Sequence, residues 1–191
     1  MIVMKKFHDL EFDIPENYHT INKDNYSSYV NNKVGFIDQW FYPEWFTNIE
    51  LGRMIVMFDE SNIEKVNTDS GSYNQSKEYM HFILGEKNYP SVSEKEYLIE
   101  YQKESYDSSK QENIELHREY LKLEISEIPS NSKYSIYSEI KWGIGQTSFM
   151  CDFFPFKENN RIYMTSLYCS DDLIDSSREN FNKILNSIKI K

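Results

Sequence analysis

The sequence predicts an α+β fold: an antiparallel sheet of about six to eight strands, flanked by helices. Strand-like stretches outnumber helical ones, and the helical stretches fall in two blocks instead of alternating with strands. Aromatic residues make up 16% of the 191 residues, which is enough apolar area for a buried core. Because domains commonly contain about 100–200 residues, we expect residues 1–191 to form a single domain.

The N-terminal third is expected to contain three strands and a short helix. Leu10, Phe12 and Ile14 alternate with acidic residues, which is typical of a half-buried strand. Residues Met54–Phe58 are apolar throughout, which is typical of a strand covered on both faces. The expected elements are a strand at 10–14, a helix at 26–30, and strands at 34–41 and 49–58.

Residues 59–90 are expected to form an insertion or a long loop. Asn, Asp, Ser and Gly dominate the first half of this segment, and these residues favour turns and loops. In the second half, Tyr79, Met80 and Ile83 follow a helical spacing that ends at Gly85. A short helix is therefore expected at 76–85.

Two capping boxes predict where two further helices begin. Ser91 and Glu94 would satisfy the free N–H groups of a helix that runs to about residue 105. Ser176 and Glu179 would do the same for a final helix that runs to about residue 186. The alternating tail, 187–191, predicts a short last strand.

Between these two helices the pattern is that of a sheet. Four stretches of strand-forming residues are separated by Pro, Gly and Asn, which predicts an antiparallel meander. The expected strands are 116–125, 133–142, 147–156 and 161–169.

The charge of the chain favours one class of partner over another. Twenty-one basic and 31 acidic side chains give a formal net charge of −10. An acidic chain repels phosphate backbones, so nucleic acid is not expected as a partner. A basic protein would be attracted by the opposite field.

The N-terminus does not have the form of a signal peptide, because its short apolar run precedes the lysines instead of following them. No stretch approaches the roughly 18 apolar residues of a transmembrane helix. We therefore expect a cytoplasmic protein with reduced cysteines. If a leader has been removed from this sequence, an extracytoplasmic location is the alternative.

Short motifs at the two ends of the chain resemble those of a known family. Phe12–Tyr18 has the form aromatic-x-Ile-Pro-x-x-aromatic, and Phe181–Ile190 has the form of a helix that runs into a Ser-aliphatic-Lys-aliphatic strand. Both are similar to the PsbP-like fold family, which includes Mog-type and DcrB-like bacterial proteins. The resemblance implies a sheet flanked by helices and a binding or assembly role, as in photosystem subunits, a partner of a nuclear-transport GTPase and secretion-effector chaperones. It brings no catalytic residues, and residues 59–90 depart from the family pattern.

The best candidate for a partner-binding segment is rich in aromatic residues. Five of them gather around one proline: Trp40, Phe41, Tyr42, Trp45 and Phe46. A strand buries only about half of its side chains on one face and the proline forces a bend, so some of these rings should be exposed. Exposed Trp and Tyr dominate binding hot spots. The alternative is a packed corner of an aromatic-rich core.

Cys151 and Cys169 are a candidate redox pair. If the hairpin between them closes on residues 159–161, the two thiols face each other across the strands. The alternative is two small core residues. No His or Lys neighbours either thiol in sequence to lower its pKa, so a catalytic thiol is not indicated.

No motif predicts a metal or a cofactor. The four histidines lack the spacing of metal ligands, and Gly143–Gly145 lacks the third glycine of a dinucleotide loop. Asp171–Asp175 matches the DDxxD string of diphosphate-binding synthases, but the chain is too short and too rich in strands for those helical enzymes. These acids are expected at the start of the last helix, where its dipole favours negative charge.

These observations together predict a non-enzymatic, cytoplasmic protein-binding domain that uses an acidic surface and an aromatic segment. An immunity-type neutraliser of a basic toxin would bind with an affinity that falls as salt rises. A secretion-effector chaperone or adaptor would use an apolar groove, with weak salt dependence. The alternatives are an enzyme of unknown reaction, which needs ionisable groups clustered in a pocket, and an extracytoplasmic PsbP-like accessory protein.

Overall fold

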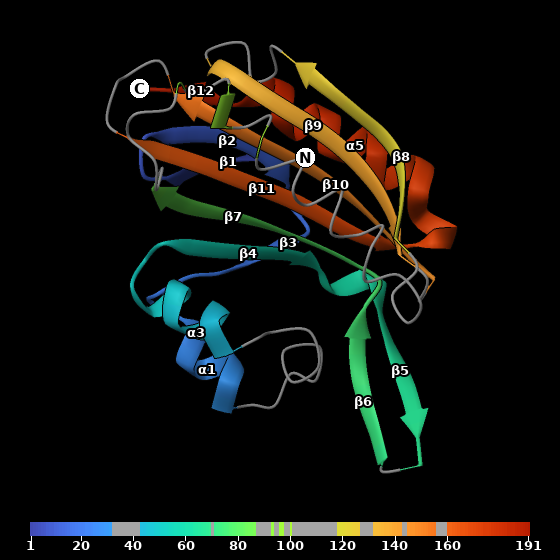
Figure 1. Cartoon of the computed structure of the whole chain (residues 1–191). Helices are drawn as coiled ribbons and strands as arrows, with labels where there is room; N and C mark the ends of the chain where they lie inside the picture. The colour runs from blue at the N-terminus through green and yellow to red at the C-terminus, as the bar shows by residue number, and fades with distance from the viewer. Residues whose placement is uncertain are drawn as a thin grey trace.

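The computed structural model describes most of the chain (Figure 1). The described residues are 1–31, 43–69, 71–86, 93, 96–97, 100, 118–126, 132–142, 145–155 and 160–191. The strand predicted at 34–41 and most of the helix predicted at 91–105 lie outside them.

Seven antiparallel strands form a large sheet in the order β3-β4-β7-β11-β10-β9-β8. These strands are β3 (Tyr18–Ile21), β4 (Met54–Asp59), β7 (Glu78–Glu86), β8 (Arg118–Ser126), β9 (Ser132–Trp142), β10 (Gln146–Pro155) and β11 (Arg161–Ser170). From β8 to β11 the order in the sheet follows the order in the chain, so the predicted meander is confirmed.

One face of the large sheet, here called the first face, is covered by the two ends of the chain (Figure 1). The covering elements are β1 (Ile2–Phe7), β2 (Leu10–Pro15), α5 (Ile174–Ser187) and β12 (Lys189–Ile190). The three strands pair in the order β1-β2-β12. The backbone N–H of Asp13 also donates to Ser187 Oγ at 2.8 Å, so the N- and C-terminal elements are tied together.

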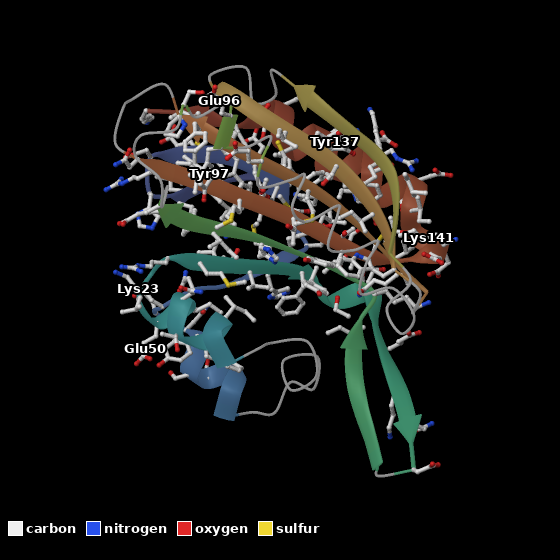
Figure 2. All side chains as sticks on the ribbon, in the orientation of Figure 1. Lys23, Glu50, Glu96, Tyr97, Tyr137 and Lys141 are labelled. Atoms are coloured by element: carbon white, nitrogen blue, oxygen red, sulfur yellow. The ribbon has the colours of Figure 1, made fainter. Side chains whose placement is uncertain are left out.

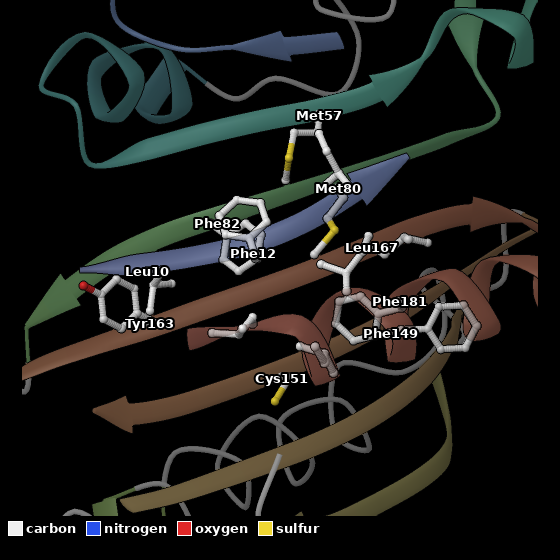
Figure 3. Packing of buried hydrophobic residues seen from close by; sticks show 14 of the residues in the cluster. Leu10, Phe12, Met57, Met80, Phe82, Phe149, Cys151, Tyr163, Leu167 and Phe181 are labelled. Carbon is white, nitrogen blue, oxygen red and sulfur yellow. The ribbon is translucent and has the colours of Figure 1, made fainter. Parts of the chain in front are cut away.

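The largest part of the apolar core lies between the first face and these elements (Figure 3). Phe149 and Cys151 of β10 are two residues apart, so they point to the same side of the sheet, and there they share a cluster with Phe181 of α5. The ring centroids of Phe12 and Phe82 lie 4.4 Å apart. Strand residues between these positions point to the opposite, second face.

Two short helices and one aromatic ring cover parts of the second face. α1 (Tyr26–Asn31) and α3 (Pro43–Glu50) are joined to β4 through a cluster that includes Ile49 and Val56, both fully buried. Further along the sheet the Tyr97 ring packs edge-on against Phe154, with centroids 5.9 Å apart. The large sheet is therefore covered on both sides.

The strand predicted at 49–58 is confirmed only from Met54 onward. Ile49 and Glu50 belong to α3, which begins at Pro43. Proline is well tolerated at the first position of a helix, because its missing N–H would have no partner there and its φ is already helical. Pro43 therefore starts a helix, where we expected it to bend a strand.

The helix predicted at 76–85 is wrong, because Glu78–Glu86 forms strand β7 in the middle of the large sheet. Met80 packs in the first-face cluster and Tyr79 in the second-face cluster, so an apolar run buried on both sides imitated helical spacing. Gly85 does not end a helix. A Cβ placed there would lie 3.0 Å from the Met164 side chain and 3.1 Å from that of Ile162.

The loop predicted for the first half of residues 59–90 is largely a β-hairpin. A 3-10 turn, η1 (Glu60–Asn62), leads into β5 (Ile63–Thr68) and β6 (Gly71–Ser76), which pair with each other and project from one end of the large sheet (Figure 1). The described side chains Glu64, Lys65 and Asn67 are exposed. Polar residues occupy both sides of these two strands. The sequence therefore lacks the alternation of apolar and polar residues that would predict β5 and β6.

One predicted capping box, Ser91 with Glu94, lies outside the described residues, and the other, Ser176 with Glu179, differs from the observed helix start. Ser93 Oγ and its N–H bond the Glu96 carboxylate at 2.7 and 3.2 Å, and Glu96 N–H donates back to Ser93 Oγ at 3.3 Å, two residues beyond the predicted box. α5 begins at Ile174 without a side-chain cap, and Ser176 Oγ donates to Leu173 O at 3.0 Å. The predicted strand at 10–14, helix at 26–30, final helix and last strand are confirmed as β2, α1, α5 and β12.

Candidate functional site

The structure describes only part of the predicted aromatic segment. Trp40, Phe41 and Tyr42 lie outside the described residues. Trp45 belongs to α3, where its backbone alone is described. Phe46 is half-buried and packs against the second-face cluster around Ile49. As a docking site the segment stays a prediction.

Cys151 and Cys169 are free thiols buried on the first face. In the ladder between β10 and β11, Cys151 is opposite Thr165, and Cys169 is opposite Thr147. The predicted face-to-face pairing is therefore wrong, because the register places each thiol four residues from the expected partner. Burial raises the pKa of Cys169 to about 11 and that of Cys151 well above its ordinary value, so both stay protonated near neutral pH.

Six carboxylates gather where α5 begins, at the end of the large sheet from which the hairpin projects. We call them the acidic end: Glu64, Glu78, Glu139, Asp171, Asp172 and Asp175. Three cations lie among them, Lys77, Lys141 (labelled in Figure 2) and Arg178. Eight of these nine residues come from β5, β7, β9, the 3-10 turn after β11, and α5, and Lys77 lies between β6 and β7.

Arg178 joins α5 to β9. Its Nε donates to both carboxylate oxygens of Glu139, at 3.1 and 3.2 Å, and one of its terminal nitrogens donates to the same carboxylate at 3.1 Å. The other terminal nitrogen donates to Asp175 at 2.9 Å. Tyr137 donates to Glu139 Oε1 at 2.8 Å, and burial together with this neighbouring carboxylate raises the pKa of Tyr137. Glu139 is thus a buried charge with a full set of partners.

Two lysines hold the exposed carboxylates of the acidic end. Lys77 Nζ lies 3.4 Å from Glu64 of the hairpin and 3.2 Å from Asp172 of the turn before α5, and the resulting hydrogen bonds raise the pKa of Lys77. Lys141 Nζ lies 3.8 Å from Asp171, which also accepts a hydrogen bond from Thr147 at 3.1 Å. Each cation is therefore engaged by carboxylates of this chain.

Glu78 is the buried member of the acidic end. It is 3% exposed, and its carboxyl group accepts hydrogen bonds from the hydroxyls of Tyr18 and Ser177. Burial raises the pKa of Glu78, and the Ser177 hydrogen bond only partly opposes this effect. The group links β3, β7 and α5 through neutral donors, in contrast to Glu139, which is held by a cation.

The outward side of the acidic end is left negative. The side chain of Asp175 is 98% exposed and that of Asp172 59% exposed, while the buried Glu139 takes up most of the Arg178 guanidinium. Six carboxylates and three cations give 3 − 6 = −3 when all are ionised. An oppositely charged partner would meet this excess at the surface.

Two clefts at the opposite end of the large sheet carry mixed charge. One, of about 340 Å³, is lined by Lys6, His8, Lys23 and Asp24 among others, and the second, of about 310 Å³, by Arg53, Glu86 and Arg161. The β1–β2 turn separates them, because His8 Nε2 donates to Gly52 O at 2.8 Å and Asp9 pairs with Arg161 at 3.2 Å. Neither cleft contains a residue predicted to act in binding.

Within the part of the chain that the structure describes, no group of three or more His, Cys, Asp or Glu side chains could hold a metal ion. Nor is any described helix long and apolar enough to cross a membrane. His81 is buried in β7, where burial lowers its pKa to about 3, so it is neutral over the physiological range.

One part of the acidic end can be predicted from the sequence, and the other part cannot. The expected position of Asp171–Asp175 at the start of the last helix is confirmed. The sequence predicts a helix at Glu78, and it does not predict the contact between Glu139 and Arg178, because that contact depends on strand register. The available signal was one acid directly before an apolar run, Tyr79–Leu84.

Comparison with solved structures finds this fold in proteins of very different sequence. The cyanobacterial PsbP protein CyanoP from Synechocystis aligns with 100% of this chain and 92% of its own chain, at a TM-score of 0.52 and 11% identity. The Ran-binding protein Mog1p from Saccharomyces cerevisiae aligns with 100% of this chain and 95% of its own, at a TM-score of 0.52 and 8% identity. No protein-family model and no curated protein sequence matches the chain. The predicted PsbP-like α+β fold is therefore confirmed.

Proposed function

We propose that this chain is a non-enzymatic protein-binding domain, and that its acidic end docks a basic partner. The observation that carries the proposal is the composition of that end, where six carboxylates outnumber three cations that are already engaged within the chain. Charge complementarity of this kind steers encounter and selects partners. The use of the same fold by the Ran-binding protein Mog1p supports a protein partner.

Within that class, we favour an immunity-type neutraliser of a basic toxin. A neutraliser must meet its target quickly, and an exposed acidic surface accelerates association with a basic protein. The exposed Asp172 and Asp175 and the hairpin residue Glu64 would face such a partner.

The test compares two variants with the same change in net charge. Asp171→Asn, Asp172→Asn and Asp175→Asn remove three charges from the acidic end, and Glu16→Gln, Asp24→Asn and Glu86→Gln remove three from elsewhere, so both change the net charge from −10 to −7. Binding to a lysine- and arginine-rich peptide, and to the proteins of neighbouring genes, is measured by titration at low and high salt. The first variant should weaken binding by about tenfold at low salt, and the second by much less.

Equal losses in the two variants would show that net charge alone acts, and would contradict docking at the acidic end. Binding that is strong but insensitive to salt would instead favour the apolar docking expected of an effector chaperone. Trp45→Ala tests the aromatic segment separately: unchanged binding of the partner would remove that segment from the proposal.

A further inference from the structure

Among the residues that the structure describes, the exposed large apolar side chains are concentrated at the N-terminus and on β1. Six large apolar side chains are exposed among the described residues, and four of them are consecutive: Met1 and the first three residues of β1. They are Met1 at 93%, Ile2 at 70%, Val3 at 39% and Met4 at 57%. The other two, Leu51 and Leu121, lie elsewhere in the chain. A contiguous exposed apolar segment of this kind marks an interaction site more often than scattered single residues do.

Among the strands that the structure describes, none pairs with the outer edge of β1. β1 is the outermost strand of the small sheet, and β2 pairs with it on one side. The two-residue turn between them closes on the pair Phe7–Leu10, so Lys5 and Val3 bond β2 as well. The backbone groups of the alternate residues, Ile2, Met4 and Lys6, therefore point away from the sheet.

The other described edges of the two larger sheets are protected in the usual ways, and the edge strand β5 of the projecting hairpin is polar, with Glu64, Lys65 and Asn67 exposed. β8 has an irregular register between Tyr120 and Lys122, which bends an edge away from pairing. β3 has four residues and β12 has two, which are too short to offer a ladder. β1 has six residues, a regular register with β2, and no charge before Lys5. The unpaired N–H and C=O groups of an edge without these protections are a template for pairing with another chain.

We propose that a second copy of this chain pairs with β1, antiparallel and about a twofold axis, so that the two small sheets join into one sheet of six strands, three from each copy. The axis passes beside Val3, so that Ile2 of each copy lies opposite Met4 of the other. Outward-pointing residues then face outward-pointing residues, which an antiparallel ladder requires.

Charge and apolarity select this register from the alternatives. Centring the pair on Lys5 would place two lysines opposite each other, which is unfavourable. Centring it on Met4 would place Ile2 opposite Lys6 and Val3 opposite Lys5. With the axis at Val3, apolar residues meet apolar residues, and Lys5 lies opposite Met1 of the second copy. The N-terminal ammonium of Met1 lies 3.7 Å from the Glu16 carboxylate, and the backbone N–H of Glu16 donates to Met1 O at 3.1 Å, so the positive charge beside Lys5 is compensated within the second copy.

A ladder of this length is a small interface. Standard stable interfaces bury roughly 1,200–2,000 Å² in total, and pairing of one short strand from each copy buries less. The dimer should therefore be reversible and dependent on concentration, with the acidic end on α5 left open in each copy, because α5 packs on the first face and β1 pairs at the far edge of the small sheet.

Sedimentation equilibrium of the untagged chain tests this pairing across a wide range of concentration. The wild type should dimerise reversibly. In the double variant Ile2→Lys with Met4→Lys, the lysine at position 2 of each copy would lie opposite the lysine at position 4 of the other. This repulsion should raise the dimer dissociation constant by about tenfold or more. Ile2→Lys with Met4→Glu should restore the dimer through Lys–Glu pairs in the Val3-centred register, and high salt should weaken that dimer. Leu51→Lys and Leu121→Lys are the matched controls, and both should leave the wild-type equilibrium unchanged.

The possible outcomes separate cleanly. A wild type that is monomeric at every concentration overturns the proposal, as does a dimer that Ile2→Lys with Met4→Lys leaves intact. Failure of the Lys–Glu variant to dimerise overturns the Val3-centred register. Because all these positions are exposed, circular dichroism should show each variant folded like the wild type.

Discussion

The two faces of the large sheet are both covered, but they are built differently. On the first face, twenty buried residues of the described chain form one continuous cluster, and the elements that cover it come from both ends of the sequence. On the second face, nine buried residues fall into two separate clusters under shorter elements. One face is a single core closed by the termini, whereas the other is assembled from smaller parts.

The ionisable groups follow the same division. Glu78 and Glu139 lie at one end of the first face, where they accept hydrogen bonds from Ser177 and Arg178 of α5. His81 lies in the interior of the second face and is 4% exposed. Charges at the margin of a core can serve a partner, while a titratable group in its interior makes stability depend on pH.

The largest difference between the faces should appear when a core side chain is shortened. Phe181→Ala removes a fully buried ring from the first-face cluster, and unfolding by urea should show a loss of about 3–5 kcal/mol. Ile49→Ala removes a fully buried side chain from the smaller second-face cluster and should lower the free energy of unfolding by about 2–3 kcal/mol. The loss is smaller because the neighbouring side chains of a small cluster can move into the cavity that the substitution leaves. Equal losses, with equal dependence on urea, would contradict the division into a major and a minor core.

The second prediction concerns His81 on the second face. Its pKa is lowered by burial from 6.5 to about 3, so between these values the unfolded chain binds a proton that the folded chain refuses. The contribution of neutral His81 to the free energy of unfolding is complete above pH 6.5, and it is lost progressively as the pH falls toward 3. Between pH 6.5 and 4.5 the wild type should lose roughly 2–3 kcal/mol more than His81→Gln, which cannot titrate. Parallel curves for the two proteins would show that His81 is accessible in the folded state.

Much of the fold could be predicted, because local residues fix many of its elements. The meander strands β8–β11 were expected within two residues of their observed bounds, since Pro, Gly and Asn mark the turns between them. α5 was visible from the helical spacing of Phe181, Ile184 and Leu185. The misassigned β7 lacks any alternation, because both of its sides are buried, and only the neighbouring strands decide that it is extended.

The candidate site was less accessible to prediction, for a physical reason. The acids of Asp171–Asp175 are adjacent in the chain, so their position at a helix start could be predicted. Glu139 and Arg178 are 39 residues apart and meet only through the pairing of β9 and the docking of α5. The same dependence on register separates Cys151 from Cys169, since a change in hairpin register moves every cross-strand neighbour together.

The smallest expected effect concerns Glu78, at the end of the first face, and the way in which its titration makes stability depend on pH. Burial raises its pKa above 4.5, so the folded chain holds a proton that the unfolded chain has released. Its contribution is complete below pH 4.5 and is lost as the pH rises through the folded value, opposite in sign to that of His81. Removing this titration by Glu78→Gln should therefore make stability rise more steeply with pH just above 4.5, whereas His81→Gln flattens that rise. Urea titrations of both variants across this window decide the matter. If both substitutions change the slope in the same direction, the pKa of Glu78 is not raised in the folded protein, and the hydrogen bonds from Tyr18 and Ser177 outweigh the effect of burial on this carboxyl group.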